Sequence, residues 1–212
     1  MKPPTRKILT SMIACTLLGA ANLASAAIFI KIDGVPGDVM GPDGSADWFV
    51  ADSFSFGVER EMKESGEKGG TEDINIGVGE LQECTISKSM DSASGKLAQF
   101  AINGNSAGKA DVCFSSGMDA NGAPNCYLRY KLDRAFVKSW STSGDADDRP
   151  TEEVAFYYNK IAFAYQVLSD TGELQQGTMS WEDRKKQAWD EGLDDIFDII
   201  SGTPVPRSPN NP

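Results

Sequence analysis

An apolar run from Val154 to Tyr165 changes the parity of its large side chains partway along. They occupy even positions first and odd positions afterwards: Val154, Phe156 and Tyr158, then Ile161, Phe163 and Tyr165. Successive residues of a strand face opposite sides, so one straight strand cannot keep both sets on one face. The run therefore predicts a bulge or bend near Asn159 and Lys160, as in a strand that turns the corner of a barrel or passes between two sheets.

An acidic loop leads into this run. It reads Gly144-Asp145-Ala146-Asp147-Asp148-Arg149-Pro150-Thr151-Glu152, and Gly, Asp and Pro all favour turns. The aspartates present several carboxylate oxygens, which calcium prefers, but their spacing lacks the ligand pattern of an EF-hand loop. We favour a solvated turn in which Arg149 pairs with a nearby carboxylate, and we expect neither a metal nor a cofactor.

The rest of the chain predicts mainly strands. Apolar residues alternate, between Gly-, Pro- and Asp-rich loops, in the ranges 27–33, 48–58, 74–78, 110–115, 126–140 and 177–181, and around Cys84 and Ile86. One short helix is expected between Asp91 or Ser92, as its N-cap, and Asn103, with Gly104 ending it.

A long hairpin is predicted from Trp48 to Val78. Its middle, residues 59–73, is charged and polar, so it cannot lie in the core and should project from the body. The apolar residues of this hairpin are Met62, Ile74, Ile76 and Val78. They need a cover, which a neighbouring subunit can supply, and we regard them as a candidate subunit interface.

The first 26 residues have the pattern of a cleavable export signal. Lys2, Arg6 and Lys7 precede an apolar stretch, and Ala24-Ser25-Ala26 forms a small-residue cleavage site before Ala27. The alternative, a membrane anchor, is disfavoured because polar residues interrupt the short stretch. We therefore expect a secreted or periplasmic protein, with a main domain at 27–181.

The C-terminal part, residues 182–212, is predicted to be an acidic amphipathic helix followed by a proline-rich tail. Ser180 would cap a helix from Trp181 to Ile200, and Gly202 would end it. The last ten residues hold four prolines and are expected to be disordered.

The composition argues against several functions. The chain has no histidine, which excludes Ser-His-Asp and Cys-His catalysis. Without the signal it carries 17 basic and 31 acidic residues, a net charge of −14, which disfavours nucleic acid. The acids at 33, 38, 43 and 47 are better explained as loop residues than as a catalytic pair. We expect no enzyme activity.

Three cysteines remain after removal of the signal. Cys113 and Cys126 lie at the two base positions of one predicted hairpin and are candidates for a disulfide in an exported protein. The alternative is that both are small buried apolar residues. Cys84 is expected to be a buried free thiol.

Part of the acidic loop, residues 147–152, resembles the signature loop of a known family. Asp147-Asp148-Arg149-Pro150-Thr151-Glu152, followed by Val154, Tyr158, Lys160-Ile161 and Tyr165, is similar to the haemolysin-coregulated protein (Hcp) family, the tube proteins of type VI secretion systems. Three further stretches stand where that family has its early strand, second strand and central hairpin: 30–34, 48–57 and 127–132. The resemblance covers roughly residues 27–181.

The resemblance implies a β-barrel of two sheets with a flanking short helix. It also implies homo-oligomerisation as hexameric rings that stack into a hollow tube, with secretion-apparatus or effector proteins as further partners. The predicted signal departs from the family, whose tube proteins usually lack one, and so does the long C-terminal segment. An exported Hcp-like binding module outside a type VI apparatus is therefore kept as an alternative.

Overall fold

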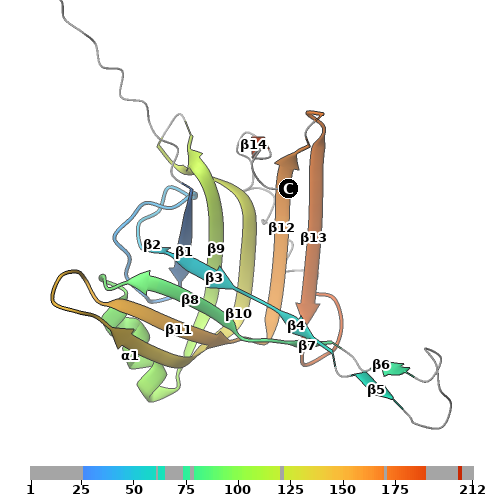
Figure 1. Ribbon diagram of the computed structural model, residues 1–212, viewed down its shortest axis with the longest axis horizontal. Helices are drawn as coiled ribbons and strands as arrows, with labels where there is room; N and C mark the ends of the chain where they lie inside the picture. Colours follow the sequence, from blue (N-terminus) through green and yellow to red (C-terminus); the bar gives the residue numbers. More distant parts are fainter. Residues whose placement is uncertain are drawn as a thin grey trace, which may run out of the picture.

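The computed structural model describes residues 26–60, 62–64, 74–76, 79–119, 122–169, 171–189 and 205–206. These residues form strands and one short helix (Figure 1). The elements in chain order are β1 Ala27–Ile32, β2 Phe49–Ala51, β3 Ser53–Ser55, β4 Val58–Glu59, β5 Met62–Glu64, β6 Ile74–Ile76, β7 Glu80–Leu81, β8 Cys84–Ser89, α1 Ser94–Asn103, β9 Ser106–Met118, β10 Pro124–Ser143, β11 Thr151–Tyr157, β12 Lys160–Leu168, β13 Leu174–Glu182 and β14 Val205–Pro206.

One curled sheet of ten strands forms the body. Its strands run in the order β2-β1-β9-β10-β11-β8-β3, and β12 branches from β10 to carry β13 and β14. The path begins and ends in one stretch of chain, because only Asp52 separates β2 from β3. β2 pairs with β1, β3 pairs with β8, and the Asp52 N–H donates to the Ser87 carbonyl at 2.8 Å. β2 and β3 do not pair with each other, so the expected barrel of two sheets is instead a curled sheet that is not closed into a barrel.

The bend predicted near Asn159 and Lys160 is confirmed. β11 and β12 both run antiparallel to β10, on the same edge, and are separated by Tyr158 and Asn159. The Asn159 N–H donates to the Asp133 carbonyl at 3.2 Å, where β10 itself is irregular and Arg134 has a φ of 54°. The kink lets Val154 and Ile161, which differ in parity, both be fully buried in one core.

The core lies inside the curl of the sheet and is covered at one end by α1. It gathers apolar side chains from β1, β8, β9, β10, β11 and α1, among them Ile30, Ile86, Leu97 and Val112. The N-cap of α1 is Ala93 and not the expected Asp91 or Ser92, and no side chain caps the helix, although the Asp91 carboxylate accepts the Ala93 N–H at 2.9 Å. Gly104 ends the helix in the left-handed conformation, as expected. Within the described residues, no helix is long and apolar enough to cross a membrane.

The expected C-terminal helix is wrong over the part of it that the structure describes. Trp181 and Glu182 complete β13, and the residues that follow form turns and a bridge between Glu182 and Gln187. Ser180 is not a helix cap. Its Oγ accepts the Trp189 N–H at 3.2 Å, because the chain reverses onto the strand pair that it has just left. Residues 190–200 of the expected helix, and the signal at 1–25, lie outside the described residues.

Candidate assembly interface

The predicted hairpin projects from the main sheet. Its two sides pair in three steps, β3 with β8, β4 with β7 and β5 with β6, and Figure 1 shows the β5–β6 end standing away from the sheet. The register sets Met62 opposite Ile76 and Glu64 opposite Ile74. Val78 lies outside the described residues. The hairpin is longer than predicted, because β8 continues its return strand.

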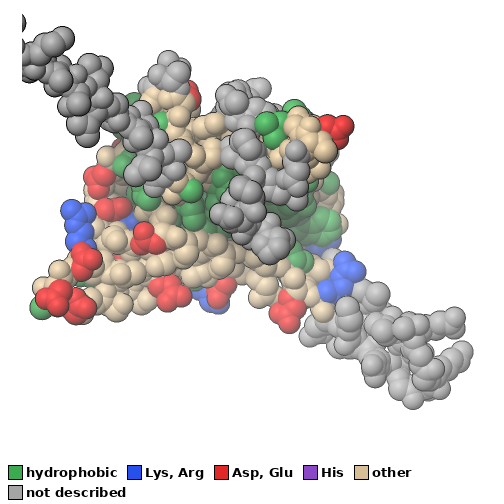
Figure 2. All heavy atoms as spheres, turned by 45° about the horizontal axis from the view of Figure 1, so that its top comes forward, with side chains coloured by type: hydrophobic (Ala, Val, Ile, Leu, Met, Phe, Trp, Pro, Cys, Tyr) green, Lys and Arg blue, Asp and Glu red, His purple; other side chains and the backbone are tan. Residues whose placement is uncertain are grey.

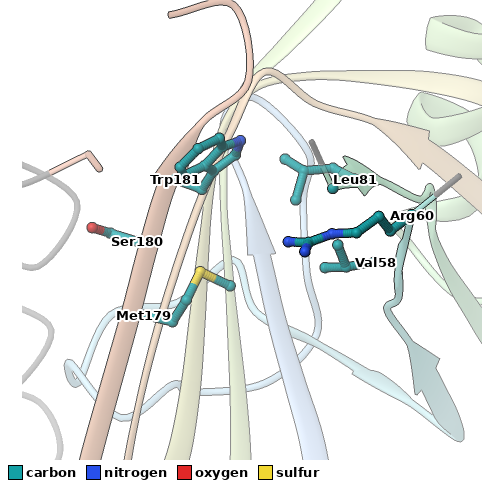
Figure 3. A pocket seen from close by; sticks show the side chains of 7 residues that line it. Val58, Arg60, Leu81, Met179, Ser180 and Trp181 are labelled. Atoms are coloured by element: carbon teal, nitrogen blue, oxygen red, sulfur yellow. The ribbon is translucent and has the colours of Figure 1, made fainter. Parts of the chain in front are cut away.

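An apolar cleft lies where the hairpin leaves the body. Its volume is about 260 Å³, and it is lined by Val58, Arg60, Gly79 and Leu81 of the hairpin and by Met179, Ser180 and Trp181 of β13. Figure 3 shows Val58, Arg60 and Leu81 facing Met179 and Trp181 across the gap. Val58 remains 56% exposed. The base of the hairpin therefore presents apolar surface and one guanidinium to whatever docks there.

The signature loop has an exposed part and a buried end. The Asp145 carboxylate accepts the Asp147 N–H at 3.1 Å, and the Asp148 carboxylate accepts the Arg149 N–H at 2.6 Å. These are hydrogen bonds of a turn. Among the described residues Arg149 forms no ion pair within 4.0 Å, so the predicted pairing of Arg149 with a carboxylate is wrong. Pro150 and Thr151 lead into β11, and Glu152 is fully buried.

Arg149 instead lines a cavity of about 270 Å³ beside Asp38 and Asp91. Hydrogen bonds from Ser92, and to a smaller extent the charges of Lys88 and Arg149, lower the pKa of Asp38. The Asp33 carboxylate accepts the Lys109 N–H at 3.0 Å. Burial alone would raise the pKa of Asp43, but hydrogen bonds from Ser45 and Lys31 outweigh it and lower the pKa to about 2. Asp33, Asp38 and Asp43 thus accept hydrogen bonds from neighbouring backbone and side-chain groups, as expected of loop residues.

A buried ion pair that sequence reasoning missed holds the signature loop to the body. Lys88 of β8 and Glu152 of β11 are opposite in register and both fully buried, with Nζ and Oε2 3.1 Å apart. Lys88 Nζ also lies 2.6 Å from Asp91 Oδ1, 2.8 Å from the Ser89 carbonyl and 3.3 Å from Ser94 Oγ. One ammonium thus joins β8, β11 and the start of α1.

A signal for this pair exists in the sequence. Glu152 shares the even parity of Val154 and Phe156, and Lys88 shares that of Cys84 and Ile86. Period-two alternation therefore places one acid and one base on inward positions of two strands. An unpaired buried charge is costly, so an inward-facing acid and an inward-facing base are expected to form an ion pair with each other.

Aromatic side chains cluster inside the curl. Tyr130 is central, with ring centroids at 5.0 Å from Phe54, 5.4 Å from Phe163 and 6.1 Å from Phe114. Burial raises the pKa of Tyr130. Figure 2 shows hydrophobic side chains gathered near the centre of one face, with acidic side chains around its border.

The structure joins Cys113 of β9 to Cys126 of β10 in a disulfide, with the Cα atoms 5.5 Å apart. Whether the exported protein forms this bond stays a prediction. Cys84 is free and buried, and burial raises its pKa to about 12, so it remains a protonated thiol at neutral pH.

The comparisons with known proteins agree with this geometry. The model of the family described as "Type VI secretion system effector, Hcp" matches residues 29–165. Three solved structures share the fold. A type six secretion system protein is 22% identical, with a TM-score of 0.65 over 78% of this chain and all of its own. Hcp1 from Salmonella typhimurium is 20% identical, with a TM-score of 0.59 over 78% and 99%. A type VI secretion system effector from Yersinia pestis is 17% identical, with a TM-score of 0.51 over 71% and 97%.

No curated protein matches the chain. The family match covers well over half of the chain, so the protein belongs to the Hcp family of type VI secretion proteins. The match ends within β12. The segment after β13 is therefore a feature of this chain outside the matched region.

Proposed function

We propose that the mature protein, residues 27–212, is a ring-forming tube protein of a type VI secretion system. The family resemblance implies that the ring has six subunits. The observation that carries the proposal is the hairpin, which stands away from the sheet above an apolar cleft of about 260 Å³ that the described residues do not fill. In a head-to-tail ring every subunit offers the same arm to its neighbour, and rotation closes the set.

The proposed role is structural, without catalysis. The chain has no histidine, and its free cysteine is buried and protonated. The acids of the signature loop make turn hydrogen bonds instead of converging on one point.

Shortening the hairpin tests the proposal. Replacing residues 62–72 by a short Gly-Ser turn should leave the far-ultraviolet circular dichroism of the mature protein intact and abolish ring assembly in light scattering. The matched control replaces the turn between β12 and β13, residues 169–173, by the same linker and should assemble normally. Rings of the shortened variant would contradict the proposal.

We further propose that the chain is exported and cleaved before Ala27, which the pattern of its first 26 residues supports. N-terminal sequencing of protein from the producing cells should read Ala27-Ile28-Phe29. A sequence that begins at Met1 would refute export by cleavage. An exported, cleaved protein that stays monomeric would favour the binding-module alternative.

A further inference from the structure

The outer part of β12 is covered by the chain's own C-terminal segment at two points. Trp189 is 9% exposed and packs on Ala162 and Ala164, with Lys160 Nζ 5.2 Å from its ring centroid. Farther along the same strand, Val205 and Pro206 pair in parallel with Val167 and Leu168, beyond the end of the β10 ladder. The segment between the two anchors therefore starts and ends at β12.

Beside the first anchor lies a buried guanidinium with unused donors. Arg129 of β10 is opposite Ala164 in register and 3% exposed. Its Nη2 is 2.9 Å from Asp111 Oδ1, while its Nε and Nη1 are buried without any hydrogen-bond partner. Trp189 Nε1 is a further buried donor in the same condition. Native proteins rarely leave such groups unpaired, least of all on a cation.

The segment that follows Trp189 carries the complementary charge. Residues 190–204 contain five acids and no base: Asp190, Glu191, Asp194, Asp195 and Asp198. Directly opposed residues of neighbouring strands have their Cβ atoms about 5 Å apart, so Arg129 lies within reach of the first residues after an anchor on Ala164. The two donor atoms that Arg129 leaves unused, Nε and Nη1, point to different edges of the guanidinium, so each can form its own charge-assisted hydrogen bond with a carboxylate oxygen.

We propose that the acidic segment 190–198 docks on this β10–β12 face, where the carboxylate of Asp190 accepts a hydrogen bond from Nε or Nη1 of Arg129. The face then binds an acidic segment that the same chain supplies. The proposal does not depend on ring assembly, and the docking segment lies beyond the family match.

Cleavage by a glutamate-specific protease tests the docking in the full mature chain. The rate of cleavage after Glu191, followed by mass spectrometry at neutral pH, measures how often the segment is released. Arg129→Gln should raise this rate by about tenfold or more, since the released population governs cleavage. The matched control Arg134→Gln, an exposed arginine of the same strand, should leave it unchanged. Cleavage after Glu152, buried in β11, should stay flat in every variant because it reports global unfolding.

Two further variants separate docking from simple damage to the sheet. Asp111→Asn removes the negative charge of the partner that Arg129 has in the structure and should change the rate after Glu191 by less than about twofold. Asp190→Asn, with its rate divided by that of the matching free peptide, should speed cleavage in the parent chain and add nothing to Arg129→Gln. Three results would overturn the proposal: an unchanged rate in Arg129→Gln, an equal rise in Asp111→Asn, or protection that grows with protein concentration. The last would assign the docked acid to a second copy.

Discussion

Two buried residues, Lys88 and Glu152, hold the signature loop against the body. Both are fully buried, and the Lys88 ammonium donates hydrogen bonds to groups of two strands and of the start of α1. Such a pair often adds little net stability compared with apolar residues of similar volume. Removing only one partner, however, leaves a buried charge without compensation. The Lys88–Glu152 pair therefore fixes the position of the signature loop while adding little to the net stability of the fold.

Replacing one member of this pair should be severe. Lys88→Met or Glu152→Leu alone should lower the free energy of unfolding by about 3–5 kcal/mol in urea titrations, because the other charge stays buried and unpaired. The double variant should lose less than the sum of the two. Lys138→Met, which breaks an exposed pair with Glu83, is the control and should cost under about 1 kcal/mol. A loss below about 1 kcal/mol in both single variants would contradict this account.

At the scale of residues, the sequence shows which side chains of a strand face the same side. The change of parity after Tyr158 predicted the break between β11 and β12, because side-chain alternation is a local property of the backbone. The same alternation also puts Lys88 and Glu152 inside, yet their pairing spans 64 residues and depends on β8 lying beside β11. The local pattern of side chains alone does not predict that β8 and β11 are adjacent strands.

At the scale of elements, the β9–β10 hairpin and the C-terminal segment show different limits. The hairpin follows from two apolar strands and a Gly-, Asn- and Pro-containing turn. The Cα atoms of Cys113 and Cys126 lie 5.5 Å apart across it, and the bond between them in the exported protein stays a prediction. The helix expected after Ser180 is wrong over residues 181–189, where the chain completes β13 and then reverses. Trp189 packs on Ala162 and Ala164 of β12, a long-range contact that the local apolar spacing does not reveal.

The disulfide between β9 and β10 gives a second stability prediction. Cys113→Ser should lower the free energy of unfolding of oxidised protein by about 3 kcal/mol, since the bond closes a loop of 13 residues in the unfolded chain. A reductant should destabilise the parent protein and leave the variant unaffected. Peptide mapping under non-reducing conditions should recover the two cysteines linked. Recovery of both as free thiols from oxidised protein would refute the bond.

At the scale of the whole molecule, the curl of the sheet brings its two end strands, β2 and β3, into one stretch of chain, which the list of strands predicted from the sequence does not show. The sequence predicted mainly strands and a projecting hairpin, but it did not predict that one stretch, residues 49–55, would serve both ends of the sheet. That arrangement depends on Asp52 bonding to Ser87, far along the chain. The result is a curled body with one long arm, whose strand pairs β4–β7 and β5–β6 are separate from the main sheet.

The mass of the unmodified mature protein tests the central claim most directly. Multi-angle light scattering at micromolar concentration and neutral pH should give close to six times the mass of one chain, with free monomer in the minority. A single-chain mass under the same conditions, from protein whose circular dichroism shows it to be folded, would contradict the ring.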